Sequence, residues 1–109
     1  VFHGRAAHAG RDHAAGRNAI AEAARFAAAL DAMSGVRKGL TVNVARIDGG
    51  GPNNIVPDAA VVRFNARVDT ADDAGWFEAE VGRRIAATNA RDGFRAHLHG
   101  SFARPPKPM

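Results

Sequence analysis

Cysteine is absent from this chain of 109 residues, so the sequence offers no disulfide, no thiolate metal site and no cysteine nucleophile. Tyrosine is also absent, and aromatic residues together account for only 6% of the chain. No apolar run is long enough to span a membrane, and the first residues lack the pattern of a signal peptide. These absences favour a soluble, cytoplasmic domain that is stabilised by packing alone.

The residues that are present predict an ordinary globular domain with a thin core. Apolar residues make up 46% of the chain, but many of them are alanine, which favours closely packed helices. The net charge of +4 comes mainly from arginines spread along the chain, a pattern typical of a solvated surface. Because the chain begins with Val1 and ends in ARPPKPM, we expect residues 1–109 to be a single domain excised from a longer protein.

Alternation and helical periodicity predict the order strand, helix, strand, strand, helix, strand. The predicted strands are Val1 to Ala7, Leu40 to Ile47, Ala60 to Asp69 and Phe94 to Phe102, and the helices are Ala19 to Met33 and a second one that begins after Thr70. This order is the split βαβ pattern of an α+β, ferredoxin-like fold. We therefore expect a four-stranded antiparallel sheet with both helices on one face.

Polar residues at the predicted helices give more detailed expectations. On the first helix, Glu22 and Arg25 fall with Asn18 on the side opposite the apolar stripe. For the second helix, Thr70 and Asp73 have the spacing of a capping box. Its apolar stripe consists of Phe77, Val81 and Ile85.

Three motifs together resemble one known module. They are GRAAHAG near the start, GRNAI at the beginning of the first helix, and GGGPNNIVPDAAVVRFNAR over the central loop and strand. In this order they resemble the dimerisation (lid) domain of the zinc aminoacylase and carboxypeptidase family. This family includes glutamate carboxypeptidase, acetylornithine deacetylase and succinyl-diaminopimelate desuccinylase. The tail HGSFARPPKP is most similar to the glutamate-carboxypeptidase branch.

The resemblance implies roles for four residues. His8 matches the histidine that reaches into the active site of the partner subunit and donates a hydrogen bond to the oxyanion. Asn54, with Asn53 beside it, matches an asparagine near the substrate, and Arg67 matches an arginine that binds the substrate carboxylate. Each residue also has a non-functional interpretation. His8 would then be a surface histidine, the two asparagines would be ordinary turn residues, and Arg67 would lie on a solvated strand face.

The resemblance also implies a whole enzyme larger than this chain. Family members hydrolyse amide bonds of N-acyl amino acids and small peptides with two zinc ions in a separate domain, and the lid domain forms a homodimer through an edge strand and a helix. The family's zinc site needs a His-x-Asp pair and adjacent glutamates, which this sequence lacks. We expect no metal ligands here, and we expect the fragment alone to be inactive.

The sequence departs from the family pattern at two positions. His13 stands where relatives often have proline, and Asn65 stands where many have aspartate. Neither change removes one of the implied functional side chains. The substitution at position 13 leaves the conformation of its loop open.

Two other function classes compete with this interpretation. A ferredoxin-like nucleic-acid-binding module would need exposed aromatic residues on the sheet, but Phe64 and Phe77 occupy predicted core positions. A ligand-sensing dimer module without an attached enzyme is the third hypothesis. His97 and His99 would share one face of the last strand and could bind a metal, although an exposed polar face is the better interpretation. His3 and His13 have no assigned role.

Overall fold

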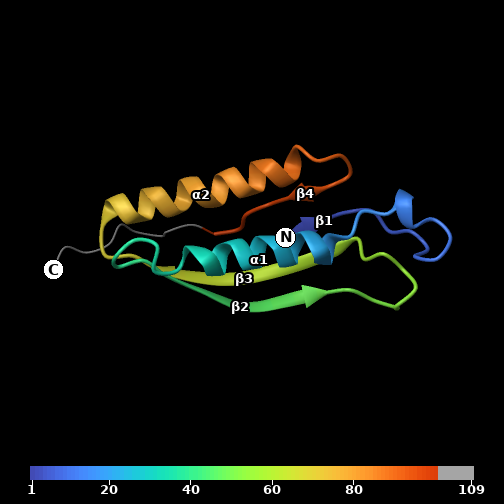
Figure 1. The fold of residues 1–109 in the computed structure, drawn as a ribbon, viewed down its shortest axis with the longest axis horizontal. Coiled ribbons are helices and arrows are strands. Elements are labelled where there is room, and N and C mark those ends of the chain that lie inside the picture. The colour runs from blue at the N-terminus through green and yellow to red at the C-terminus, as the bar shows by residue number, and fades with distance from the viewer. Residues whose placement is uncertain (101–109) are drawn as a thin grey trace.

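The computed structural model describes residues 1–100, and Figure 1 shows the course of the chain. The elements are β1 (Phe2–His3), a short 3-10 helix η1 (His13–Ala15), α1 (Ala19–Met33), β2 (Thr41–Gly49), β3 (Ala59–Arg67), α2 (Ala71–Asn89) and β4 (Arg95–Ala96). The predicted order of elements is confirmed. The first helix has the predicted bounds.

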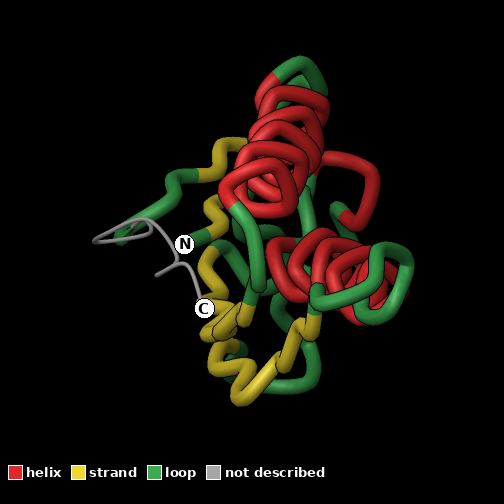
Figure 2. The backbone as a smooth tube through the Cα atoms, turned by 90° about the vertical axis from the view of Figure 1, so that its left-hand side faces the viewer, coloured by secondary structure: helices red, strands yellow, loops and turns green. Residues whose placement is uncertain are grey.

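The sheet and the helices form two layers, as Figure 2 shows. The strands are arranged in the order β2-β3-β1-β4, and every neighbouring pair is antiparallel. Both helices cover the same face of the sheet. The α+β, ferredoxin-like fold is therefore confirmed, with β2 and β4 as the outer strands.

A chain of phenylalanine rings connects the two layers of the core. The ring of Phe26 on α1 lies between Phe2 and Phe64, at centroid distances of 5.1 and 6.0 Å. Phe64 in turn contacts Phe77 on α2 at 6.2 Å. Tilted and edge-on contacts of this kind are favourable for aromatic rings. The sequence prediction that Phe64 and Phe77 belong to the core is confirmed.

Both helices begin with a side-chain cap. The Asn18 side chain accepts a hydrogen bond from the Ala21 N–H, and the Thr70 hydroxyl accepts one from the Asp73 N–H. The reciprocal half of the predicted capping box is wrong, because the Asp73 carboxylate instead accepts from Arg37 Nε at 2.7 Å. In the described part of the chain, neither helix has the length and apolar character needed to cross a membrane.

The first and last strands are shorter than the sequence predicts. Regular pairing in β1 covers Phe2 and His3 only, and β4 ends at Ala96. A strand is stabilised by hydrogen bonds to a neighbouring strand. Because β1 has only two residues, β4 pairs with it over only two residues. The sequence predicted a strand from Phe94 to Phe102. Residues 97–100 form no strand, and residues 101 and 102 lie outside the described residues.

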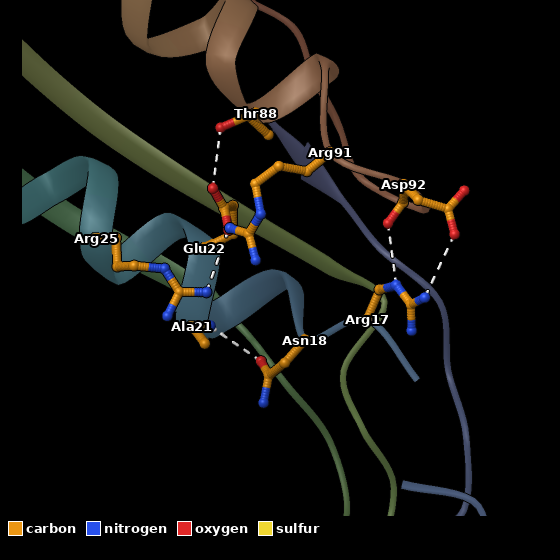
Figure 3. A network of polar contacts seen from close by, with 8 residues as sticks. All are labelled: Arg17, Asn18, Ala21, Glu22, Arg25, Thr88, Arg91 and Asp92. Carbon is orange, nitrogen blue, oxygen red and sulfur yellow. Dashed lines mark hydrogen bonds and ion pairs between the residues drawn. The ribbon is translucent and has the colours of Figure 1, made fainter. Parts of the chain in front are cut away.

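The position of Glu22 corrects a third prediction. Its side chain is only 9% exposed because α1 faces α2 at this point, so it does not lie on a solvated side of the helix. Its carboxylate accepts from the Thr88 hydroxyl at 3.1 Å, from Arg25 at 3.2 Å and from Arg91 (Figure 3). Glu22 thus joins α1 to the end of α2.

Candidate functional site

His8 lies on a loop that pairs with a second loop at one end of the sheet. We call residues 5–17 the His8 loop and residues 50–58 the Asn54 loop. His8 forms an antiparallel bridge with Ile55. On either side of it, the Ala9 N–H donates to the Asn54 carbonyl and the Val56 N–H donates to the Ala7 carbonyl, each at 2.8 Å. This pairing brings His8 and Asn54 together, although they are far apart in sequence.

Hydrogen bonds from its own loop orient the His8 ring and favour one tautomer of the neutral imidazole. Its Nδ1 atom accepts hydrogen bonds from the backbone N–H groups of Gly10 and Arg11, both at 3.2 Å. Because Nδ1 acts as the acceptor, the proton of a neutral imidazole resides on Nε2. The side chain is half-buried, and no acceptor within residues 1–100 takes this proton. The geometry therefore presents an oriented N–H donor.

Small residues permit the close packing at the base of the His8 loop. A Cβ atom added at Gly4 would lie 2.0 Å from the Arg17 carbonyl oxygen, so the two backbone segments can pair only with glycine at this position. At Gly10, by contrast, a Cβ atom would meet only the His8 ring at an ordinary 3.6 Å. Close packing thus requires glycine at Gly4, at the base of the loop, and not at Gly10 beside the His8 ring.

Arg17 fixes the loop to the turn that follows α2. Its guanidinium donates from Nε to the Asp92 carbonyl at 3.0 Å and lies 3.4 Å from the Asp92 carboxylate (Figure 3). It also donates to the carbonyls of Ala14 and Gly16 within the loop. Helical or strand periodicity contains no signal for these contacts, so sequence reasoning missed the role of Arg17.

The structure places Arg67 at the opposite end of the sheet from His8. Arg67 is the last residue of β3 and pairs in register with Thr41, whereas Ala59 at the other end pairs with His3. At roughly 3.3 Å per residue, the two ends of β3 are about 27 Å apart. A single chain therefore does not bring Arg67 to His8 and Asn54.

The sheet face that carries Arg67 is exposed among the described residues. Arg63, Asn65 and Arg67 are exposed on the face away from the helices, as their alternation in β3 predicts. No carboxylate of the described residues forms an ion pair with Arg67. Asn53 and Asn54 are likewise exposed, in a turn of the Asn54 loop.

The remaining histidines are scattered. His13 begins η1 and its carbonyl accepts from the Gly16 N–H at 3.0 Å, so the loop conformation that the sequence left open is a 3-10 turn at this position. His97 and His99 follow the end of β4 and do not share a strand face as predicted, and the ring of His97 meets that of His3 at 6.0 Å. In residues 1–100, no three side chains of the His, Cys, Asp or Glu type gather to hold a metal.

Comparison with known proteins identifies the same module. The chain is 40% identical over 73 residues to indole-3-acetyl-aspartic acid hydrolase from Enterobacter agglomerans, which corresponds to 66% of this chain and 17% of that protein. The crystal structure of aminobenzoyl-glutamate utilization protein from Klebsiella pneumoniae superposes with a TM-score of 0.71 and 31% identity, over 79% of this chain and 22% of that one. The chain thus spans about a fifth of the length of these relatives.

A more distant structure shows the fold alone. A putative amidohydrolase/peptidase from Burkholderia cenocepacia gives a TM-score of 0.84 at 19% identity, over 96% of this chain and 26% of that one. The family model described as the peptidase dimerisation domain matches residues 1–93. The match covers most of the chain and includes both loops of the candidate site, and the chain therefore belongs to the peptidase dimerisation domain family.

Proposed function

We propose that this chain is the homodimerisation and lid domain of a zinc-dependent amidohydrolase or peptidase that cleaves amide bonds of N-acyl amino acids or small peptides. The observation that carries the proposal is the His8 ring, which is oriented by two backbone N–H groups and paired with the Asn54 loop. The names of the relatives support the chemistry, since indole-3-acetyl-aspartic acid is an N-acyl amino acid.

In this proposal His8 stabilises negative charge that develops on the substrate. When a nucleophile adds to an amide, its carbonyl oxygen becomes an oxyanion, and the Nε2–H of His8 donates to it. A preorganised donor of this type is worth about 3 kcal/mol of transition-state stabilisation. The half-buried ring matches the requirement for a donor that is fixed yet reachable.

Asn54, Asn53 and Arg67 bind the substrate in the same proposal. The exposed amides of the two asparagines offer donors and acceptors beside His8. Arg67 supplies a planar guanidinium, which binds a carboxylate through two parallel hydrogen bonds. Free carboxylates are a common feature of N-acyl amino acids and peptides.

The zinc ions belong to a domain outside this chain. The described residues do not fit a metal site, because their carboxylates and imidazoles do not cluster. Residues 1–109 would act as a module of the larger enzyme and would be inactive alone.

The outer edge of β2 is the surface that we assign to the homodimer. β2 has nine residues, and its outer edge pairs with no strand of the described chain. Such an edge is a template for another strand. Ala24 and Ala28, one turn apart on α1, are exposed, so a second helix could approach closely. Two copies would then form one continuous eight-stranded sheet.

Twofold symmetry then brings the separated site residues together. If two β2 strands pair antiparallel, the Gly49 end of one strand lies beside the Thr41 end of the other. His8 and Asn54 lie toward the Gly49 end, and Arg67 lies at the Thr41 end. Each site would therefore combine His8 and Asn54 of one copy with the partner's Arg67.

Replacement of His8 in the full-length enzyme tests the proposed function. We expect His8→Ala to lower kcat about 10²- to 10³-fold with little change in KM, because the lost donor acts on the transition state. His13→Ala is the matched control, since His13 lies exposed in the same loop. An unchanged kcat in His8→Ala would exclude His8 from the reaction.

A further inference from the structure

Arg17 belongs to the GRNAI motif, but neither the family resemblance nor the proposed function assigns it a role. Figure 3 shows its side chain directed toward Asp92, in the turn between α2 and β4. Nε donates to the Asp92 carbonyl at 3.0 Å, and Nη1 donates to the carbonyls of Ala14 and Gly16 at 3.0 and 2.8 Å. All three acceptors are main-chain oxygens. The guanidinium therefore links the backbones of two segments that are 75 positions apart in the sequence.

The main chain of Arg17 closes the His8 loop at its base. Its N–H donates to the Arg5 carbonyl at 2.8 Å, and its carbonyl accepts from the Arg5 N–H at 2.9 Å. The turn after α2 leaves room for the side chain because position 93 is glycine, where an added Cβ atom would lie 2.5 Å from Arg17 Cγ. Gly93 also has a φ of +83°, which favours glycine. Arg17 thus fixes the loop through both its main chain and its side chain.

A short series of backbone contacts connects the Arg17 side chain to His8. The carbonyl of Ala14, which accepts from Arg17, belongs to η1. The Asp12 carbonyl accepts from the Ala15 N–H at 2.9 Å, and the Asp12 N–H donates to the His8 carbonyl at 2.8 Å. The turn that begins at His8 also supplies the two N–H groups that donate to its ring. Movement of η1 would therefore be transmitted to the ring of His8.

The shape of the guanidinium matters more here than the charge of its partner. The Asp92 carboxylate is 86% exposed and lies 3.4 Å from Arg17 Nη2, and exposed ion pairs contribute little. The Arg17 side chain itself is only 27% exposed. Its planar group donates in two directions at once, toward η1 and toward the turn after α2. The single ammonium of a lysine cannot occupy both donor positions.

We propose that Arg17 is a positioning residue for the reaction assigned to His8. By joining η1 to the turn after α2, it keeps the His8 ring in the orientation that presents the Nε2–H group to the substrate. This inference rests on the proposed function, because Arg17 acts only through His8. Donors must be held close to their productive geometry by the residues around them. Loss of the guanidinium would slow the chemical step and leave substrate binding intact.

Replacement of Arg17 in the full-length enzyme tests this role. We expect Arg17→Met to lower kcat about 10- to 10²-fold with little change in KM, because a displacement of about 1 Å costs a reaction this much. Arg17→Lys should recover little of the loss. Asp92→Asn should lose much less activity than Arg17→Met, because the Asp92 carbonyl remains as an acceptor.

Arg91→Met is the matched control for a general loss of stability. Arg91 is an arginine beside the same turn, but its guanidinium contacts Glu22 on α1 and the ring of Phe94. We expect Arg91→Met to destabilise the domain and to leave the kcat of the folded enzyme unchanged. An equal loss of kcat in Arg91→Met and Arg17→Met would overturn the positioning role.

Combination with His8→Ala tests whether Arg17 acts through His8. In the His8→Ala enzyme, Arg17→Met should cause no further loss of kcat, because the positioned donor is already gone. A further loss of the same size in the double variant would assign Arg17 a general structural role and would contradict the inference.

Amide hydrogen exchange in the full-length enzyme provides a measurement besides activity. We expect faster exchange at Asp12 and Ala15 in Arg17→Met and unchanged exchange in Arg91→Met. An unchanged kcat in Arg17→Met would overturn the positioning role, and if His8→Ala still lowered kcat, the proposed function would stand. An unchanged kcat in His8→Ala would overturn both.

Discussion

Arg67 is the residue whose proposed role depends most on its chemical type. Its side chain is exposed at the end of β3, with no ion pair inside the described chain. In the full-length enzyme we expect Arg67→Lys to raise KM about tenfold for substrates with a free carboxylate. Lysine keeps the charge but loses the second parallel hydrogen bond.

The neighbouring arginine on the same face provides the control for this change. Arg63→Lys alters the same residue type four positions earlier in β3, and we expect no comparable change in KM. A carboxylate-free amide analogue should be cleaved equally well by the wild-type enzyme and by Arg67→Lys. An equal loss on that analogue would contradict carboxylate binding by Arg67.

Glu22 stabilises the contact between the two helices. Removal of its carboxylate would leave the buried Thr88 hydroxyl without its acceptor and would release Arg91 from α1. We expect Glu22→Ala to lower the free energy of unfolding by about 2 kcal/mol in urea denaturation. Glu22→Gln keeps an acceptor for Thr88 and should lose less.

An exposed glutamate on α2 serves as the reference for Glu22. We expect Glu78→Ala to change the free energy of unfolding by less than about 0.5 kcal/mol, as is usual for surface positions. If Glu22→Ala were equally mild, the three contacts of Glu22 would contribute nothing measurable to stability.

For single residues, the sequence predicted which side of the sheet a side chain faces better than it predicted contacts between distant residues. Alternation placed Arg63, Asn65 and Arg67 on the exposed face of the sheet, which is confirmed. Periodicity placed Glu22 on the polar side of its helix, which is wrong, because it cannot show that a second helix covers that side. The pairing of His8 with Ile55 has no local signal either, since it depends on two loops meeting in space.

Among the elements, β2 combines a long open edge with an apolar side chain at that edge. Ile47 is 44% exposed, and Ala45 forms a bulge between Val44 and Arg46 where the register shifts. We expect Ile47→Lys to abolish self-association of the chain in sedimentation, because a charge on an edge strand opposes pairing with a second strand.

Val36 provides a matched test of whether the edge itself matters. It is also apolar and is 61% exposed, but it lies in the connection between α1 and β2. We expect Val36→Lys to self-associate like the unchanged chain. Loss of association in both variants, or in neither, would remove β2 as the dimer edge.

The lengths of the elements show where prediction from sequence stops. The bounds of α1 follow from its own pattern, because its cap at Asn18, its apolar stripe and the Ser34-Gly35 end are all local. The length of β4 does not, because a strand needs a neighbour along its whole length. His97 exchanges two backbone hydrogen bonds with Val1, yet residues 97–100, which alternate in sequence, form no strand.

At the scale of the whole molecule, the residues that the family resemblance assigns to one site lie far apart within a single chain. His8 and Asn54 lie at one end of the sheet, and Arg67 lies about 27 Å away at the other, at roughly 3.3 Å per residue along β3. An antiparallel pairing of β2 edges would bring the two ends of different copies together. The sequence left open whether Asn54 and Arg67 act in their own subunit, and only the arrangement of the strands makes that question testable.

Mixed dimers of the full-length enzyme test this arrangement. A subunit with His8→Ala is combined with a subunit with Arg67→Ala, and the mixed dimer is purified by two different affinity tags. If each site takes His8 from one copy and Arg67 from the other, one site carries both defects and the second carries neither. We expect about half of the wild-type kcat/KM per dimer, although both homodimers are impaired in kcat/KM. If both residues served a site from the same subunit, each site of the mixed dimer would carry one defect. Activity would then stay at the level of the homodimers, which would contradict the shared site.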